Sequence, residues 1–386
     1  MKVAIVTDYL LQLGGAEKVT SIISELYPQA DVYTLICDEK VKEKYFKGRN
    51  VTEHPAFKDS SWKRKYYRAL FPLYPTYIED FDLKAYDLII SSSYLWAKGV
   101  LPDIDAVHIS YVHTPLRQAW VKYHEYLYNE NDIGRIKRFL LRFIMNYVRI
   151  WDVTNSNRVD YFIANSQTVK RRIEKIYRRP ADVIYPPIEV ADHKKHAKQT
   201  FGNHYVSLGR LVPYKRVDLL IEAFNKSMNR KLYIMGDGND RKRLEKLIQS
   251  PNIHLMGYVD EYTKMKIISS AKGFIFATEE DFGMSPVEAM ATGVPVIGFD
   301  KGGTRDYIRE GVNGTFFQHQ TPEALIYAMD RFEKMQFDKQ KIIQSVQKFS
   351  KASFKYQFEE FVENKIAEKQ LRAERGGIYT TRMLRS

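Results

Sequence analysis

The 386-residue sequence predicts an α/β protein with two doubly wound domains, each built on a parallel β-sheet. Short runs of β-branched and aromatic residues alternate with amphipathic helical segments, a pattern typical of βαβ units. The chain is too long for one hydrophobic core, and the alternation restarts after a polar stretch at residues 191–200. Two such domains facing one another would bring the carboxyl ends of their strands to a shared cleft, where doubly wound sheets bind ligands.

In the first half, strands are expected at 3–6, 88–91, 106–112, 161–164 and 183–185, with helices such as 17–26 between them. In the second half, strands are expected at 204–208, 231–235, 253–256, 273–277 and 295–298. The sequence thus predicts an N-terminal Rossmann-like domain at 1–190, a C-terminal Rossmann-like domain at 191–350, and a helix with a tail at 351–386.

The last helix is expected to bury one face, formed by Phe354, Phe358, Phe361 and Val362. Gly376-Gly377 should end it, because glycine is the usual residue after a helix. Residues 378–386 have no apolar periodicity and are expected to form a loose basic tail.

The composition is that of a globular protein, with 44% hydrophobic and 13% aromatic residues. The single Cys37 excludes an internal disulfide and a multi-cysteine metal site, and it fits a reducing compartment. The apolar run at 3–6 is too short for a signal peptide, and the most apolar segment, 139–151, is interrupted by Arg142, Asn146 and Arg149. We therefore expect a cytoplasmic protein that does not span a membrane.

The charge balance predicts an anionic partner. Lys and Arg number 60 against 47 Asp and Glu, which leaves a net charge of +13. A surplus of this size suits nucleic acid, a phosphorylated ligand or a membrane surface, and the pI alone does not choose among them.

The first strand leads into Leu13-Gly14-Gly15-Ala16-Glu17. Adjacent glycines let the backbone approach a ligand closely, and the following helix offers free N–H groups to an anion. A phosphate site and a tight strand-to-helix turn without a ligand are both compatible with these residues, which do not form the full dinucleotide fingerprint.

A second loop with charge follows the strand that ends at Leu208. It reads Gly209-Arg210-Leu211-Val212-Pro213-Tyr214-Lys215-Arg216 and runs into a helix. A guanidinium fork and an ammonium group on one loop suit a diphosphate. The alternative is a pair of solvated charges.

The strongest motif places Glu280 and Glu288 eight positions apart, with Gly283 between them and Ser285-Pro286 opening a helix. Carboxylates of this kind accept hydrogen bonds from vicinal hydroxyls, and a helix N-terminus between them can hold an anion. The arrangement suits a sugar, a phosphate and a ribose in series. A capping box formed by Ser285 and Glu288 would explain Glu288 without a ligand, and Glu279-Glu280-Asp281 could likewise be a solvated acidic loop.

These residues resemble those of a known family. Residues 280–288 resemble the E-x7-E motif of retaining glycosyltransferases of family 4, which have the GT-B fold, and Gly209-Arg210-x4-Lys215 resembles their diphosphate-binding loop. The resemblance covers essentially the whole chain, including residues 14–17, 113–115, 302–303 and 311–314. The sequences of residues 280–288 and 70–75 are most similar to those of mannosyltransferases that synthesise bacterial surface polysaccharides such as lipopolysaccharide.

The resemblance implies a nucleotide diphosphate sugar as donor, best guessed as GDP-mannose. Arg210 and Lys215 would neutralise the diphosphate, Glu288 would hold the ribose hydroxyls, and Glu280 would bind the transferred sugar. The backbone of Phe282, Gly283, Met284 and Ser285 would contact the sugar and the distal phosphate, and the base would lie against Met256, Gly257 and Tyr258.

For the N-terminal domain, the resemblance implies that Gly14 and Gly15 close over the phosphates. His113 would lie near the reacting carbon, although a lone histidine after a strand is otherwise more often structural. The family also implies that the final helix crosses back to the first domain.

Transfer with retention would then proceed by attack of the acceptor on the same face of the sugar from which the diphosphate leaves. The motif contains no carboxylate that is an obvious nucleophile for a double displacement. Preorganised cations at the leaving group would provide much of the stabilisation of the negative charge that develops on the departing diphosphate. No cofactor and no catalytic metal are expected, and the D-x-D strings at 80–82 and 103–105 are more simply solvated turns.

Residues 134–149 form an amphipathic, basic and acid-free segment that predicts an interfacial helix. Packing of its apolar face against the domain core is the alternative. Further basic clusters lie at 62–68 and 170–172. We expect a glycan or polyprenyl-diphosphate-linked acceptor, and peripheral attachment to the anionic inner face of the cell membrane through Arg135, Lys137, Arg138 and Arg142.

Other function classes are compatible with parts of this pattern. A UDP-sugar-dependent transferase, or a nucleotide-sugar epimerase of GT-B fold, would use a similar donor site. A non-enzymatic nucleic-acid-binding protein would also be basic and aromatic-rich, but Glu280 and Glu288 would repel a polyanion. We therefore expect no nucleic-acid partner.

Overall fold

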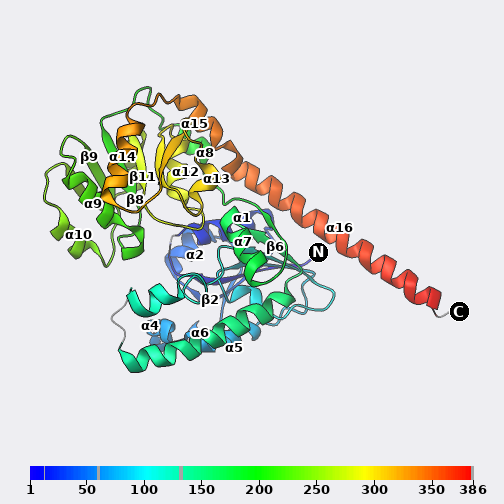
Figure 1. The fold of residues 1–386 in the computed structure, drawn as a ribbon. Helices are drawn as coiled ribbons and strands as arrows, with labels where there is room; N and C mark the ends of the chain where they lie inside the picture. The colour runs from blue at the N-terminus through cyan, green and yellow to red at the C-terminus, as the bar shows by residue number, and fades with distance from the viewer. Residues whose placement is uncertain (13, 59–60, 130–133, 384–386) are drawn as a thin grey trace. The chain divides into compact units, whose positions relative to one another are not determined.

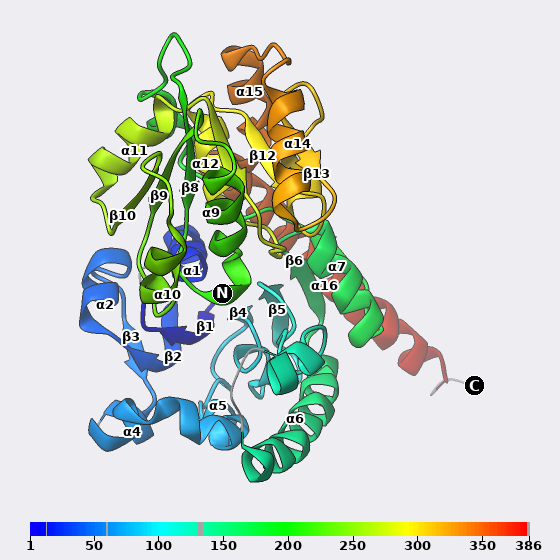
Figure 2. The same cartoon turned by 60° about the vertical axis from the view of Figure 1, so that its left-hand side comes forward.

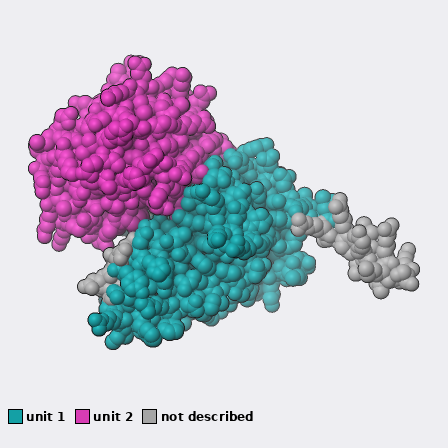
Figure 3. Space-filling view, in the orientation of Figure 1, with its two compact units in different colours: residues 1–185, 354–386 teal, residues 186–353 magenta. Residues whose placement is uncertain are grey.

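The computed structural model describes residues 1–12, 14–58, 61–129 and 134–383, and the chain divides into two compact units (Figures 1 and 3). Unit 1 consists of Met1–Tyr185 and Phe354–Ser386, and unit 2 consists of Pro186–Ser353. The division falls before the polar stretch at 191–200. Residues near the junction belong to unit 2 because the Ile188 N–H donates to the Phe349 carbonyl at 2.8 Å, and the Lys351 N–H donates to the Ile188 carbonyl at 3.1 Å.

Unit 1 contains a seven-stranded parallel sheet in the order β3-β2-β1-β4-β5-β6-β7. Its strands are β1 (Val3–Leu10), β2 (Asp31–Cys37), β3 (Val51–Glu53), β4 (Leu88–Ser93), β5 (Val107–Val112), β6 (Tyr161–Ala164) and β7 (Ala181–Val183). Its helices before the crossover are α1 (Gly15–Leu26), α2 (Glu39–Tyr45), α3 (Pro55–Lys58), α4 (Ser61–Lys65), α5 (Tyr74–Glu79), α6 (Arg135–Asn155) and α7 (Gln167–Ile176).

Unit 2 contains a six-stranded parallel sheet in the order β10-β9-β8-β11-β12-β13. Its strands are β8 (His204–Leu208), β9 (Lys231–Met235), β10 (Ile253–Gly257), β11 (Gly273–Phe276), β12 (Val296–Phe299) and β13 (Gly314–Phe317). Its helices are α8 (Val190–Lys194), α9 (Val217–Asn225), α10 (Arg241–Leu247), α11 (Glu261–Ser269), α12 (Met284–Ala291), α13 (Thr304–Tyr307), α14 (Pro322–Phe332) and α15 (Lys339–Ser345).

Each sheet reverses its strand order once. In unit 1 the reversal lies between β1 and β4, and in unit 2 it lies between β8 and β11. Connections from the two strands at such a point leave toward opposite faces of the sheet, so the space at their carboxyl ends stays free for a ligand or for the chain's own side chains. The predicted fold class of two Rossmann-like domains is confirmed.

Side chains define the beginnings of several helices. The helices α2, α7, α11, α14 and α15 each begin after a residue whose side chain accepts a hydrogen bond from a first-turn N–H group. The capping residues are Asp38, Ser166, Asp260, Thr321 and Asp338. These caps satisfy donors that the helix itself leaves unpaired.

The helix α16 (Lys351–Met383), drawn in Figures 1 and 2, contributes its first turns to the core of unit 1. Phe354, Phe358 and Val362 are buried among residues of β1, β4 and β5. The ring of Tyr111 on β5 lies 5.9 Å from that of Phe354. The predicted crossing back of the last helix is therefore confirmed.

The predicted end of this helix at Gly376-Gly377 is wrong, because α16 continues through both glycines to Met383. Glycine inside a helix costs about 1 kcal/mol relative to alanine, but it keeps its N–H group and does not break the hydrogen-bond ladder. The expected loose tail is thus helical at 378–383, and its last residues, 384–386, lie outside the described part of the chain.

Three strands differ from the sequence expectation, which contained no strand at β2, β3 or β13. The strands β3 and β13 are short and lie at sheet edges. In β2, Asp31, Tyr33 and Thr34 interrupt the apolar run expected of a buried parallel strand. The strand β7 begins two residues earlier than expected and ends at Val183, before the restriction imposed by Pro186 and Pro187.

Within the described ranges, no helix combines the length and the apolar character needed to cross a bilayer.

Candidate active site

The loop after β8 is held close to the next strand connection by glycines. The N–H groups of Gly209 and Leu211 donate to the carbonyls of Met235 and Asp237, at 3.1 and 3.0 Å. A Cβ atom at Gly236 would lie 1.9 Å from the Gly209 carbonyl oxygen, so only glycine permits this approach. The loop that carries Arg210 and Lys215 therefore has a fixed backbone.

A second glycine pair supports the loop that carries Glu280. The Gly303 N–H donates to the Glu280 carbonyl at 2.8 Å, and Glu280 forms an isolated β-bridge with Gly302. A Cβ atom would lie 2.2 Å from the Glu280 oxygen at Gly302, and 2.3 Å from the Phe282 Cα at Gly303. The Gly302-Gly303 turn thus fixes the position of the Glu280 backbone.

The two loops meet at the point where the strand order of unit 2 reverses. The Lys215 ammonium and the Glu280 carboxylate form an ion pair, with side-chain exposures of 15% and 19%. The Thr278 hydroxyl also donates to the Tyr214 carbonyl at 2.9 Å, which ties the loops together. Because an ammonium group has three donors, Lys215 can hold Glu280 and still donate to an anion.

Arg210 lies at the exposed edge of the same loop. One guanidinium nitrogen lies 3.4 Å from the Tyr214 hydroxyl oxygen, at the long end of the hydrogen-bond range. Arg210 and Lys215 thus place two cations on one loop, as the diphosphate hypothesis requires.

Glu288 lies half-buried on α12 and, among the described residues, makes no hydrogen bond or ion pair. The capping-box alternative is therefore wrong. The helix begins at Met284 after Gly283, which has a φ of +81°, and it has no side-chain cap. The Ser285 hydroxyl instead lies 3.5 Å from the Leu208 carbonyl oxygen, and Pro286 is the third residue of the helix rather than its first.

The predicted base-binding loop lies at the end of β10. Met256 and Tyr258 are exposed, and Gly257 has a φ of +69°. The sequence analysis did not identify Arg241, whose guanidinium lies 2.7 Å from the place of a Cβ atom at Gly257. The Arg241 guanidinium forms ion pairs with Asp237 and Glu245, each four residues away in the sequence. This i,i+4 spacing of opposite charges was the sequence signal that could have identified Arg241.

Two further side chains of unit 2 support the site and were not predicted from the sequence. Gln320 donates to the Ala277 carbonyl at 2.7 Å, just before the Glu280 loop. Arg216 adopts a left-handed backbone conformation, with a φ of +54°, and its guanidinium lies 3.4 Å from the Gln320 side-chain oxygen. No sequence motif distinguishes this glutamine from an ordinary surface residue.

The predicted residues of unit 1 lie at the ends of its own central strands. Gly14 precedes the first residue of α1, Gly15, and a Cβ atom at Gly14 would lie 2.6 Å from a Glu17 carboxylate oxygen. Leu13, quoted with these glycines, lies outside the described residues.

His113 is buried at the end of β5. Its Nε2 atom lies 2.8 Å from the Ser92 hydroxyl, which in turn lies 2.7 Å from the Thr20 hydroxyl. Burial lowers the pKa of His113 to about 3, so the imidazole is neutral at physiological pH. A neutral imidazole can donate or accept one hydrogen bond near a sugar, but it does not supply a positive charge.

Asp8 on β1 is the prominent residue of unit 1 that the sequence analysis missed. Its carboxylate is buried and accepts hydrogen bonds from four consecutive backbone N–H groups, those of residues 94–97. Burial raises the pKa of Asp8, and the backbone hydrogen bonds oppose this shift. An aspartate inside a strand gave no sequence signal, because its donors come from a loop 86 residues later.

Within the described residues, no cluster of three His, Cys, Asp or Glu side chains has metal-binding geometry. The two D-x-D strings make contacts within the protein. Asp82 and Asp103 accept hydrogen bonds from the N–H groups two residues ahead, and Asp80 lies 3.3 Å from His54.

Comparison with known proteins identifies both halves of the chain. Residues 13–192 match the family model described as Glycosyltransferase Family 4, and residues 189–349 match the one described as Glycosyl transferases group 1. An uncharacterized glycosyltransferase of Methanocaldococcus jannaschii is 28% identical over 193 residues, which cover 44% of this chain and 50% of the relative. The match thus spans about half of that relative's length.

Solved structures share the fold. The apo form of the lipopolysaccharide outer core galactosyltransferase WaaB has a TM-score of 0.66 and 18% identity, over 95% of this chain and 100% of that one. Anabaena HepE in complex with UDP-glucose has the same score and identity, over 94% and 100%. The two family matches follow one another from residue 13 to residue 349, so the chain belongs to the GT-B glycosyltransferases of the group 1 and family 4 type.

Proposed function

We propose that this protein transfers a hexose from a nucleotide diphosphate sugar to a glycan or lipid-linked saccharide, with retention of configuration. The observation that carries the proposal is the Lys215–Glu280 ion pair at the strand reversal of unit 2, together with Glu288 on the following helix α12, which has no polar partner among the described residues. Cations suit a diphosphate, and carboxylates suit sugar and ribose hydroxyls.

In this mechanism the acceptor oxygen attacks the anomeric carbon on the face from which the diphosphate departs. The bond from that carbon to the diphosphate oxygen breaks as the bond to the acceptor forms, and the departing phosphate takes the proton of the acceptor hydroxyl. Lys215 and Arg210 stabilise the negative charge that develops on the leaving group, and the mechanism invokes no catalytic metal.

Glu280 has two tasks in the proposal. It accepts hydrogen bonds from hydroxyls of the transferred sugar, and through its ion pair it fixes the Lys215 ammonium beside the diphosphate. The α12 N-terminus, with the backbone of Phe282, Gly283, Met284 and Ser285, faces the distal phosphate and the sugar. Glu288 binds the ribose, Met256, Gly257 and Tyr258 contact the base, and Gly14, Gly15 and His113 act from unit 1.

We propose GDP-mannose as the donor and a surface polysaccharide, such as lipopolysaccharide, as the product, on the motif resemblance described above. The acceptor is a polyprenyl-diphosphate-linked or other glycan, and the enzyme works at the inner face of the cell membrane as a peripheral protein. A UDP-sugar is the second candidate donor, favoured by the UDP-glucose named in the HepE complex.

A thermal-shift titration with GDP-mannose, GDP, UDP-glucose, UDP-N-acetylglucosamine and UDP tests the donor, because a ligand that binds only the native state raises its apparent stability. Selective stabilisation by the guanine nucleotides is the expected result. Uridine selectivity would replace the donor and keep the mechanism, whereas no shift with any nucleotide would remove the proposal.

A further inference from the structure

The helix α6 presents two apolar faces, and the described residues cover one of them. Met145 and Val148 are buried in the core of unit 1, with Ile144 and Trp151 packed beside them. A second set of apolar side chains recurs every three or four residues on another face and is exposed, with Ile136 at 80% and Phe143 at 62%. This outer stripe consists of Ile136, Phe139, Leu140, Phe143, Tyr147 and Ile150.

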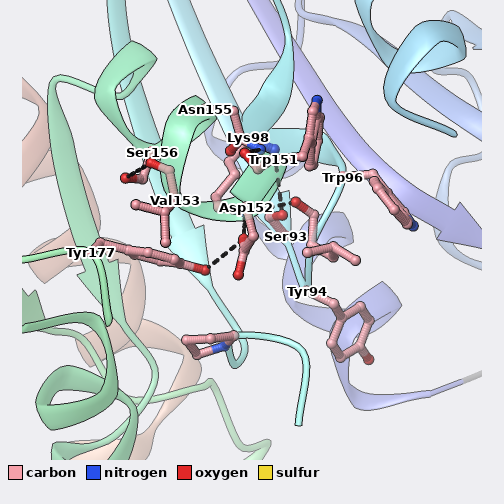
Figure 4. Close-up of polar contacts among 12 residues, drawn as sticks. Ser93, Tyr94, Trp96, Lys98, Trp151, Asp152, Val153, Asn155, Ser156 and Tyr177 are labelled. Carbon is pink, nitrogen blue, oxygen red and sulfur yellow. Dashed lines mark hydrogen bonds and ion pairs between the residues drawn. The ribbon is translucent and has the colours of Figure 1, made fainter. Parts of the chain in front are cut away.

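The helix cannot turn the outer stripe inward, because a polar cluster anchors its inner face (Figure 4). Asp152 is fully buried and forms an ion pair with the buried Lys98. The other Asp152 oxygen accepts a hydrogen bond from the Trp120 indole at 2.7 Å, and Tyr177 donates to the first at 3.0 Å. Breaking such a buried pair would cost several kcal/mol, so the exposure of the outer stripe is a fixed property of the fold.

Positive charge borders the outer stripe. Residues 134–151 contain five Lys and Arg residues and no Asp or Glu. Among the described residues, Arg142 donates to the Tyr128 hydroxyl at 2.5 Å and Arg149 to the Ala119 carbonyl at 3.0 Å, so a neutral partner positions each guanidinium. The cations are Arg135, Lys137, Arg138, Arg142 and Arg149.

We propose that the outer stripe of α6 docks on the surface of an anionic lipid bilayer. The apolar side chains would enter the boundary between headgroups and acyl chains, and the flanking cations would bind lipid phosphates. This inference deepens the proposed peripheral location and rests on it for its biological purpose, which is to bring the enzyme to a lipid-linked acceptor.

The shape of the patch favours a bilayer over the other occupants. The stripe runs along a 21-residue helix whose one acidic residue, Asp152, is buried and whose other charged residues are basic, which matches a flat anionic surface with an apolar interior. Nucleic acid would contact the cations but leave six apolar side chains in water. The helix α4 lies at the same end of unit 1 in both views, and the exposed Trp62 and Tyr66 lie on it and directly after it (Figures 1 and 2).

Sedimentation of the full chain with vesicles tests the proposal. Binding to vesicles of phosphatidylcholine and phosphatidylglycerol should be much tighter than binding to phosphatidylcholine alone. The triple variant Phe139→Gln/Phe143→Gln/Tyr147→Gln should weaken binding at least tenfold. Its matched control, Met228→Gln/Tyr327→Gln/Tyr356→Gln, removes three exposed apolar side chains on other elements and should bind as the parent does.

A second pair of variants isolates the charge. Arg135→Gln/Lys137→Gln should weaken binding to the anionic vesicles by roughly 30-fold, since each cation near an anionic surface contributes about 1 kcal/mol. Lys242→Gln/Lys246→Gln lowers the net charge equally on the exposed face of α10 and should change binding little. Equal losses in both variants would overturn the assignment to α6.

Two further outcomes would also overturn it. One is unchanged vesicle binding of the Phe139, Phe143 and Tyr147 variant. The other is sedimentation velocity showing a dimer that this variant converts to a monomer, because a second copy of the chain would then cover the stripe. Nucleotide thermal shifts on the same samples separate this inference from the proposed function. If the parent chain does not bind the vesicles but its nucleotide shifts are intact, only the docking surface is contradicted. If the parent chain binds the vesicles but shows no nucleotide shift, only the donor proposal is contradicted.

Discussion

The two sheets have the same strand reversal, but the charged side chains at their carboxyl ends differ in exposure and in what they contact. In unit 1, the buried Asp8 carboxylate occupies the backbone N–H groups of the loop after β4. In unit 2, the corresponding space beside β8 and β11 holds Lys215, Glu280 and Glu288, which are partly exposed. One unit satisfies its N–H groups with an anion of its own, and the other leaves charged groups available.

The comparison shows that the strand reversal locates a possible ligand site. It does not show whether the chain's own side chains already occupy that site. A loop whose N–H groups bind a carboxylate of the same chain contributes to the stability of the fold. A loop whose charged groups remain accessible can instead bind a ligand. Substitutions at the two reversals should therefore have different consequences, and the following predictions test that separation.

The largest effect is expected in unit 2. Lys215→Ala should lower kcat/KM by about 10³-fold, because it removes the cation at the leaving group. Glu280→Ala should abolish transfer while leaving the fold intact. Steady-state transfer assays and circular dichroism check both. Lys226→Ala, which breaks an exposed Lys–Glu pair in the same unit, is the control and should keep full activity. Normal activity of either site variant would refute the mechanism.

Asp8→Ala should instead destabilise unit 1 by about 3 kcal/mol, because it leaves four backbone N–H groups, three of them buried, without their acceptor. Urea unfolding measures the loss, and nucleotide titration of the folded variant should give parent-like affinity. Asp82→Ala, at an exposed turn, serves as the control. A loss below about 1 kcal/mol would mean that the carboxylate is not needed there.

The stability of unit 1 should also fall with acid. Burial lowers the pKa of His113 to about 3 and of His108 to about 4, from an ordinary value of 6.5. Below pH 6.5 the unfolded chain takes up protons that the folded chain does not, so stability is complete above that pH and is lost as the pH falls toward the folded pKa values.

Each histidine should contribute a loss of about 2 kcal/mol between pH 8 and pH 5. His113→Gln should remove one of these contributions, which denaturant unfolding at several pH values would detect. The raised pKa of Asp8 acts in the opposite direction, so the difference between parent and variant is the informative quantity. An unchanged pH slope would show that His113 is accessible to protons in the folded state.

The smallest effect is expected for Glu288→Gln, which keeps the shape of the side chain and removes its charge. Loss of the charge-assisted bonds to ribose should weaken nucleotide binding about tenfold without lowering stability. Isothermal titration calorimetry measures it, with Glu323→Gln as an exposed control. Loss of stability would instead point to a structural role for Glu288.

The sequence was sufficient for the fold class, for most strands and for the loops that carry Lys215 and Glu280, because these depend on local apolar runs and on short motifs. It was insufficient for Asp8, whose partners are set by the packing of a distant loop, and for the end of α16, where glycine was given too much weight as a helix terminator. It left both faces of α6 open, since periodicity cannot show which of two apolar stripes a core covers.

The junction near Ile188 and Lys351 has a consequence for how the chain is made. Unit 2 is inserted between two parts of unit 1, whose core includes Phe354 and Phe358. During synthesis, the first 185 residues emerge without these side chains, and the whole of unit 2 follows before they appear. Domains generally fold as units as they emerge. Unit 2 can therefore finish folding on the ribosome before unit 1, although unit 1 is begun first.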